Sequence, residues 1–203
     1  MAIFFTSDTH FGHRNIITYC DRPWNSVEEM NEELIARWNN VVGPRDDVYH
    51  LGDFCMGRKS VPGNWVPRLN GRIHLIRGNH DPVVKGQGFE TVQDYLEVKY
   101  YKKKIVLFHY PIRNWNGSHK GSWHLFGHVH GTLTVKYGRK CLEDSLAMDV
   151  GSDCHDWRPI SADEVVEIMI KQEKYLKEKF ATEDPKGELS NKDKLLRKRI
   201  GSL

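Results

Sequence analysis

The sequence predicts a single α/β domain, and two kinds of segment carry that prediction. Several short apolar runs, rich in β-branched and aromatic residues, each end at a glycine or a polar residue, as β-strands do. Two other segments open with a capping box and continue with apolar residues at helical spacing. At 203 residues the chain is long enough for one well-buried domain.

The predicted elements follow one another along the chain. Strands are expected over residues 2–7, 47–51, 72–77, 123–126 and 147–150, with a hairpin-like stretch over 94–108. The first helix is expected over 28–40, after the capping box Ser26-Val27-Glu28-Glu29, and the second runs from Ser161 towards Phe180. Lys102-Lys103-Lys104 is expected at the solvated tip of the hairpin.

Five short polar motifs lie where the predicted strands end. In chain order they are Asp8-Thr9-His10, Gly52-Asp53, Gly78-Asn79-His80-Asp81, His109 and Gly127-His128-Val129-His130. A single Asp-x-His or His-x-His is more often a surface or core pair than a ligand set, but five in series are hard to produce by core packing. Because open α/β sheets bind ligands at the carboxyl ends of their strands, these side chains are expected to converge.

The residue types of these motifs predict metal chemistry. Two divalent cations about 3.5 to 4 Å apart need a bridging anion, oxygen and imidazole donors, and open positions for water and substrate. Aspartate, asparagine and histidine are such donors, whereas the four cysteines have no ligand-like spacing. The residues therefore favour redox-neutral hydrolysis.

The order of these motifs resembles that of the calcineurin-like metallophosphoesterase superfamily, whose pattern is D-x-H, G-D, G-N-H-[DE], H and G-H-x-H. Further segments, such as His109-Tyr110-Pro111 and Arg158-Pro159-Ile160-Ser161, resemble a branch of small bacterial and phage members. The resemblance covers about residues 1–172. It implies a four-layer α-β-β-α sandwich with two mixed β-sheets, and a hydrolase of phosphate esters.

The resemblance also implies a role for each motif residue. One metal would be held by Asp8, His10, Asp53 and His130, and the other by Asp53, Asn79, His109 and His128, so that Asp53 is the bridge. His80 is similar to the family's catalytic histidine, which is not a ligand, and Asp81 would orient it. Ligands of this kind accept manganese, our first choice, as well as nickel, iron, cobalt or zinc.

The loop at residues 110–122 follows His109 and has the composition of a functional loop. Arg113 offers a guanidinium for phosphate, and Trp115 offers a face on which a base can stack unless it closes a small core. His13 is expected either to contact the substrate phosphate or to orient a metal ligand. Small single-domain members of the superfamily often look like diesterases, so the resemblance, together with Arg113 and Trp115, implies a phosphodiesterase acting on a nucleotide or nucleic acid. A phosphomonoesterase and a non-catalytic protein-binding scaffold of the same fold are the alternatives.

Charge, hydropathy and cysteine usage bear on the partners and the cellular compartment of the protein. The net charge of +3 and a pI near 8.6 neither favour nor exclude a nucleic-acid partner. No segment approaches the length of a membrane span, the N-terminus lacks the pattern of a signal peptide, and the scattered cysteines suit reduced thiols. A cytoplasmic protein is therefore expected.

The C-terminal residues 173–203 are expected to form a charged helical or flexible extension, because charges alternate there with few apolar anchors. Two alternatives stay open: Leu195, Leu196 and Ile200 dock on a partner subunit to form a homodimer, or the basic end contacts nucleic acid.

Overall fold

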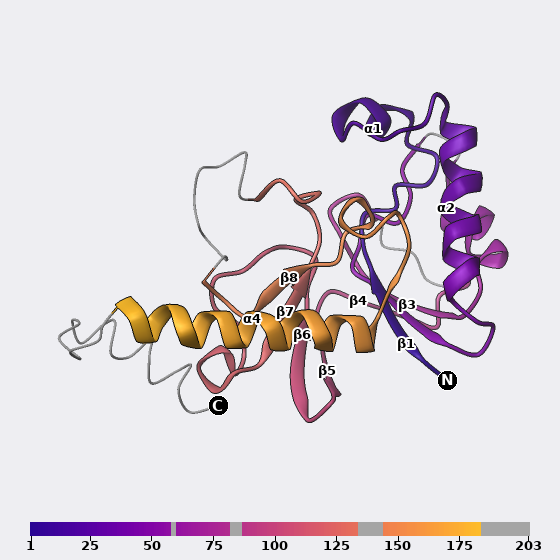
Figure 1. Cartoon of the computed structure of the whole chain (residues 1–203). Coiled ribbons are helices and arrows are strands. Elements are labelled where there is room, and N and C mark those ends of the chain that lie inside the picture. Colours follow the sequence, from indigo (N-terminus) through magenta and orange to yellow (C-terminus); the bar gives the residue numbers. More distant parts are fainter. Residues whose placement is uncertain (58–59, 82–86, 134–143, 184–203) are drawn as a thin grey trace.

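Two mixed β-sheets form the centre of the molecule in the computed structural model, which describes residues 1–57, 60–81, 87–133 and 144–183 (Figure 1). The order of the first sheet is β4 (Thr91–Gln93), β3 (Arg72–Ile76), β2 (Asp47–His50), β1 (Ile3–Thr6) and β9 (Ile160–Ser161). The order of the second is β5 (Leu96–Tyr100), β6 (Lys103–Leu107), β7 (Trp123–Phe126) and β8 (Ala147–Asp149). All neighbouring strands run parallel except β9 beside β1 and β5 beside β6.

Helix α2 (Val27–Val41) covers one face of the first sheet. At its start the Ser26 hydroxyl accepts a hydrogen bond from the Glu29 amide at 3.1 Å, while the Glu29 carboxylate accepts from the Asn25 amide at 3.0 Å. These bonds satisfy backbone donors that the helix itself leaves free. The buried side of α2, including Met30 and Trp38, packs on the first sheet, as the helical spacing predicts.

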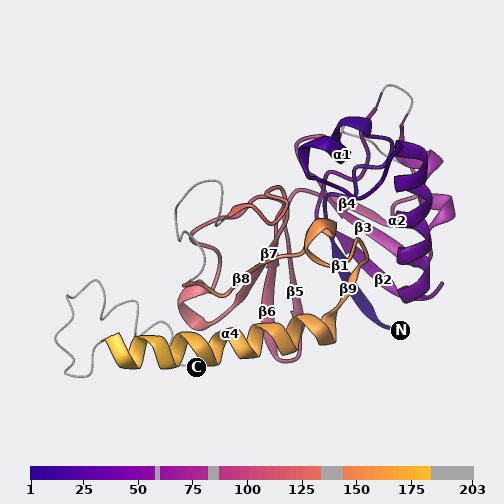
Figure 2. The same ribbon diagram turned by 45° about the horizontal axis from the view of Figure 1, so that its top comes forward.

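The main core lies between the two sheets. Phe5 and Ile76 from the first sheet pack with Ile105 and Leu107 from the second, and helix α4 (Ala162–Glu183) adds its own apolar residues to this cluster. Figures 1 and 2 show α2 beside the first sheet and α4 along the second. The layers are therefore α2, first sheet, second sheet and α4, which confirms the predicted α-β-β-α sandwich.

Helix α4 begins at the predicted capping box, in which the Ser161 hydroxyl accepts from the Glu164 amide at 3.2 Å and Glu164 accepts from the Ser161 amide at 2.9 Å. The helix continues without a break past residue 172. The Glu173 carboxylate accepts from the Trp123 indole at 2.7 Å, and Leu176 is fully buried. Residues of α4 just beyond the predicted boundary at residue 172 therefore also pack on the second sheet. The apolar residues considered for docking, Leu195, Leu196 and Ile200, lie outside the described residues.

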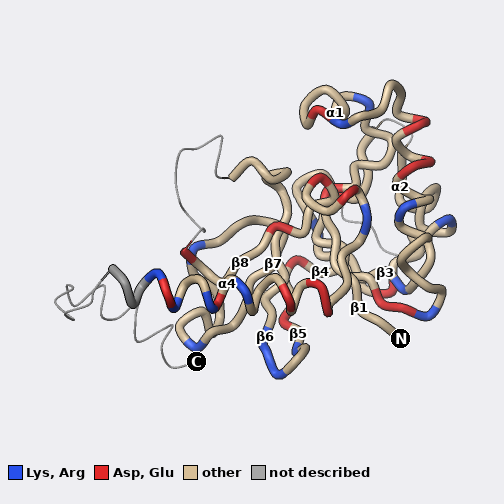
Figure 3. The backbone as a smooth tube through the Cα atoms, in the orientation of Figure 1, with Lys and Arg blue, Asp and Glu red and all other residues tan. Residues whose placement is uncertain are grey.

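The lysine run was wrongly predicted to lie wholly at a solvated tip. Lys102 lies in the turn between β5 and β6, where basic residues gather in Figure 3. Lys103 instead reaches Glu173 of α4 at 2.6 Å, and Lys104 reaches Glu97 of β5 at 2.7 Å. No helix among the described residues is long and apolar enough to cross a membrane.

The carboxyl ends of five strands deliver the five motifs. Asp8 and Asp53 follow β1 and β2, Asn79 follows β3, and His109 and His128 follow β6 and β7. Short elements that the sequence did not predict complete the frame: β4, β9 and helix α1 (Arg14–Tyr19).

Candidate metal centre

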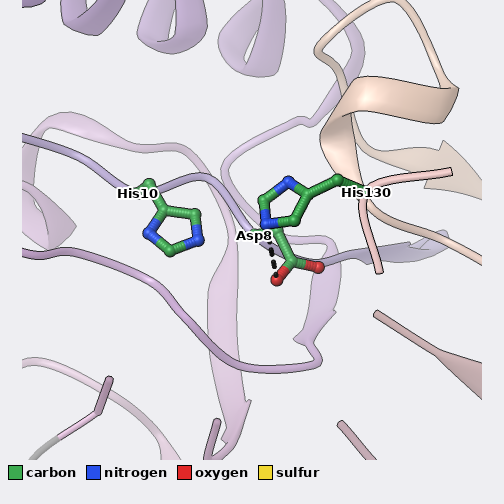
Figure 4. A group of neighbouring side chains, drawn as sticks. All are labelled: Asp8, His10 and His130. Atoms are coloured by element: carbon green, nitrogen blue, oxygen red, sulfur yellow. Dashed lines mark ion pairs between the residues drawn. The ribbon is translucent and has the colours of Figure 1, made fainter. Parts of the chain in front are cut away.

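Six of the seven predicted ligands form two groups at the edge where the strands end. Within each group, one nitrogen or oxygen atom per residue lies within 4.8 Å of the others. The first group comes from the ends of β1 and β7, and Figure 4 shows its two imidazole rings with the carboxylate near them. The groups are Asp8, His10 and His130, and Asp53, His109 and His128.

Asp53 lies between the two groups. Its Oδ2 is 3.6 Å from His10 Nε2 in the first group and 3.6 Å from His109 Nε2 in the second. A carboxylate in this position has the placement that a ligand shared by two cations requires. The seventh predicted ligand, Asn79, lies with the second group, since its Oδ1 is 3.1 Å from His109 Nε2.

Two buried polar atoms of the first group indicate that the residues fit a cation. Asp8 Oδ1 and His10 Nε2 are buried without a hydrogen-bond partner among the described residues, although such atoms are normally paired. Burial raises the pKa of Asp8 to about 8 and lowers the pKa of His10. A divalent cation at these atoms would satisfy both groups and favour the ionised carboxylate.

Hydrogen bonds behind the predicted ligands hold two of the histidine rings. His109 Nδ1 lies 2.7 Å from the Leu51 carbonyl oxygen, which can only accept, so the proton is on Nδ1 and Nε2 faces the centre. His130 Nδ1 lies 2.8 Å from Asp153 Oδ2 in the same arrangement. These bonds fix the tautomer and the direction of each ring.

Arg22 and Asp153, for which the sequence predicts no role, support this group. The buried Arg22 guanidinium donates to both Asp153 carboxylate oxygens at 2.8 Å and to the Asp8 and Thr9 carbonyls at 2.7 and 3.0 Å. Burial opposes charge on Asp153, but the bond to His130 and the Arg22 charge lower the pKa of Asp153. Burial likewise opposes charge on His130, yet the bond to Asp153 raises the pKa of His130 to about 10. Metal binding at His130 would displace the proton that the raised pKa otherwise keeps on the ring.

A third combination, Cys20 with His130 and Asp153, also lies within 4.8 Å. Its Asp153 carboxylate already bonds to His130 Nδ1 and to the Arg22 guanidinium. The unpaired atoms of Asp8 and His10 therefore make the first group the better cation site.

The backbone of the predicted ligands is unusual. Five of the seven have positive φ, a conformation that is uncommon for residues other than glycine and is found at strained functional sites. The close approach of the two sheets also constrains Gly127, because a Cβ there would clash with Ser7 and Asp8. The Asp8 carboxylate in turn accepts from the His128 amide at 2.9 Å, which joins the ends of β1 and β7. The five φ values are 57° at Asp8, 51° at His10, 55° at Asp53, 72° at His128 and 48° at His130.

His80 lies at the rim of the centre. Its amide donates to Asp53 Oδ1 at 2.9 Å, and its Nε2 is 4.0 Å from Asp53 Oδ2. The side chain is 39% exposed, so it faces both the ligands and solvent.

The prediction that Asp81 orients His80 is wrong. The two carboxylate oxygens of Asp81 accept from three backbone amides: those of Asp53 at 2.7 Å, Phe54 at 2.9 Å and Gly78 at 2.8 Å. Asp81 therefore holds the turn that presents Asp53 and ties it to the end of β3.

The structure separates the three predicted substrate residues. His13 lies beside the centre, with its Nδ1 3.3 Å from His10 Nδ1, and burial lowers the pKa of His13. Arg113 is exposed on the loop after His109. Trp115 is buried in the core, and its indole N–H donates to the carbonyl and the hydroxyl of Ser122, both at 3.1 Å. The prediction that Trp115 offers a stacking face is therefore wrong. The alternative, that Trp115 closes a small core under the loop, agrees with its burial.

Known proteins resemble this chain over most of its length. Residues 1–157 match the family model of the calcineurin-like phosphoesterase superfamily domain. An uncharacterized protein of Methanocaldococcus jannaschii is 36% identical over 176 residues, covering 83% of this chain and 92% of that protein. The gene 66 protein of Mycobacterium phage D29 is 27% identical over 198 residues, covering 82% of this chain and 95% of that protein. Among solved structures, a protein of unknown function from Aquifex aeolicus superposes with a TM-score of 0.67 and 25% identity, covering 82% of this chain and 98% of that one.

Proposed function

Because the chain belongs to the calcineurin-like phosphoesterase superfamily, we propose that it is a two-metal phosphodiesterase whose substrate is a nucleotide or the end of a nucleic acid. The observation that carries the proposal is the position of Asp53 Oδ2, 3.6 Å from one ligating nitrogen of each group. One carboxylate placed between two sets of donors supports a pair of cations better than a single ion.

The ligands divide between two cations, with manganese as the proposed metal. When bound, such a pair lowers the pKa of a water to about 7 and neutralises charge on the phosphoryl oxygens. Asp8 and Asp53 supply the negative charge that favours dications, and the oriented imidazoles fix their positions. The proposed sets are Asp8, His10, Asp53 and His130 for one cation, and Asp53, Asn79, His109 and His128 for the other.

His80 is the proposed general acid. Its ring lies near the bridging carboxylate but remains partly exposed, so it can reach the oxygen that leaves phosphorus and protonate it. His13, whose ring centroid lies 5.2 Å from that of His10, is proposed to contact the phosphate.

Metal content of Asp53→Ala tests the shared ligand. We expect two ions per wild-type chain by elemental analysis and loss of both in the variant, because Asp53 contributes to each site. Asp94→Ala, which removes an exposed carboxylate paired with Arg77, should keep two ions and serves as the control. A single ion in the wild type, or two ions retained in Asp53→Ala, contradicts the scheme.

Hydrolysis of a substrate panel tests the reaction class. The panel pairs a nucleoside phosphodiester with the corresponding phosphomonoester, each with manganese and with nickel. Faster turnover of the diester supports the proposal. Turnover of the monoester alone would make the protein a phosphomonoesterase, and turnover of neither with both ions bound would favour the scaffold alternative.

Substitution of His80 tests the general acid. A poor alkoxide leaving group needs a proton in the transition state, whereas p-nitrophenolate does not. His80→Asn should therefore slow an alkyl or nucleoside diester by roughly 10²- to 10⁴-fold and an aryl ester appreciably less, with unchanged metal content. Equal slowing of both esters would show that His80 stabilises phosphoryl charge instead.

A further inference from the structure

A pocket of about 540 Å³ opens beside the candidate metal centre. Two predicted ligands, His128 and His130, form part of its wall. Any group attached to a phosphate at the centre therefore has this pocket within reach. The volume lies within the range of about 300 to 1,000 Å³ that is typical of pockets for small organic ligands.

The remaining wall is mostly apolar and comes from three separate segments. Helix α1 contributes Ile16 and Tyr19, the loop after His109 contributes Pro111, and the loop after β7 contributes Val129 and Leu133. Among the described residues that line the pocket, none is a lysine, arginine, aspartate or glutamate. Such a wall favours an uncharged group, since a second phosphate there would lose its hydration without a cationic partner.

Tyr19 gives the pocket an aromatic surface. Its side chain is 72% exposed, and the edge-to-face contact of its ring with His13, at a centroid separation of 6.3 Å, places it next to the centre. An exposed aromatic ring on a pocket wall is a platform on which another flat ring can stack. The sequence predicts this role for Trp115, but that side chain is buried.

We propose that this pocket binds one uncharged aromatic substituent of the phosphate ester, a nucleobase or an aryl group, with Tyr19 as its stacking face. The inference rests on the proposed function and narrows its substrate class. A polynucleotide backbone would need basic residues along its path, and the described lining offers none. The described lining of this pocket therefore favours a small diester that carries a nucleoside or an aryl group over a polynucleotide.

Competitive inhibition by two phosphonate monoesters of equal charge tests the proposal. One carries a nucleoside and the other a methyl group, and both are measured against the same reporter ester. A stacked base contributes about 1 to 3 kcal/mol to binding. Tyr19→Ala should therefore weaken binding of the nucleoside phosphonate by roughly 5- to 150-fold and leave binding of the methyl phosphonate unchanged. Tyr19→Phe should keep the discrimination, and Tyr175→Ala, at an exposed tyrosine of α4, is the matched control. Equal effects of Tyr19→Ala on both phosphonates would overturn the proposal.

Alkylation of Cys20 gives a readout that does not depend on turnover. Cys20 is partly buried and lines the same pocket, so an occupying ring should slow its modification, followed by peptide mass spectrometry in the metal-loaded protein. We expect protection by the nucleoside phosphonate and not by the methyl phosphonate. Equal rates with and without a saturating nucleoside phosphonate would refute the pocket assignment. A protein that hydrolyses no ester but shows this protection would refute the proposed function and retain the aromatic pocket.

Discussion

Asp81→Asn is the substitution that best separates support of the metal centre from catalysis. The change keeps the shape of the side chain but replaces one carboxylate oxygen with an NH₂ group. Oδ2 accepts from the amides of Asp53 and Gly78, and Oδ1 accepts from that of Phe54. Either orientation of the new amide therefore places an NH₂ group against at least one N–H.

The size of the effect follows from these contacts. A hydrogen bond to a charged group contributes about 1.5 to 3 kcal/mol, and at least one of the three is lost and replaced by a donor facing a donor. We expect a total penalty of roughly 2 to 4 kcal/mol, shared between the free energy of unfolding and metal binding. Because the turn presents Asp53, the metal affinity should fall about 10- to 100-fold, as for other groups that hold ligands in place.

Metal titration and thermal unfolding of the variant, with and without metal, measure the two parts of this penalty. Asp94→Asn, at an exposed carboxylate, is the control and should match the wild type. At saturating metal, Asp81→Asn should slow aryl and alkyl esters by similar factors. Wild-type metal affinity and Tm, together with a larger effect on alkyl than on aryl esters, would show that Asp81 acts through His80 and would refute this reasoning.

Three further substitutions test other parts of the structure. Asp153→Asn should lower metal affinity about 10- to 100-fold in a metal titration, because it weakens the hold on a ligating ring; unchanged affinity would contradict this. The Arg158 guanidinium holds the pKa of Glu164 at about 2, so Glu164 contributes stability above its unfolded value near 4.5 that is lost as the pH falls towards 2. With this side chain 41% exposed, Glu164→Gln should cost about 1 kcal/mol or less in denaturant unfolding at pH 7, and a difference that persists at pH 2 would oppose the assignment. Leu176→Ala should lower the free energy of unfolding by about 2 to 5 kcal/mol. A loss below about 0.5 kcal/mol would show that this turn of α4 does not contribute to the core of the domain.

The elements that the sequence predicted well are those whose signal is local. The strands that deliver the motifs are apolar runs that end at a polar residue, and both long helices begin at a serine followed three residues later by a glutamate. Strands β4 and β9, with three and two residues, are too short to show a period. The burial of Leu176, beyond the predicted boundary at residue 172, was not apparent from the sequence because charged residues on the exposed side of α4 surround it.

The parts of the site that the sequence did not predict depend on distant partners. Arg22 and Asp153 are 131 residues apart, so no local pattern marks them as a pair. Asp81 follows His80 directly, and that adjacency suggested a contact, but its real partners are amides 27 and 28 residues earlier and the amide of Gly78. Trp115 lies in a loop without periodicity, where only the fold decides whether an indole is covered.

The positive φ angles of the predicted ligands restrict which residues these positions can accept, independently of metal binding. Asparagine, aspartate, histidine and glycine tolerate this conformation, whereas a β-branched side chain is strained in it. His128→Asn and His128→Val would both weaken the second ligand group, but only the valine should also destabilise the fold. A descendant of this chain that no longer bound metal would therefore still be confined to a small set of residues at these five positions.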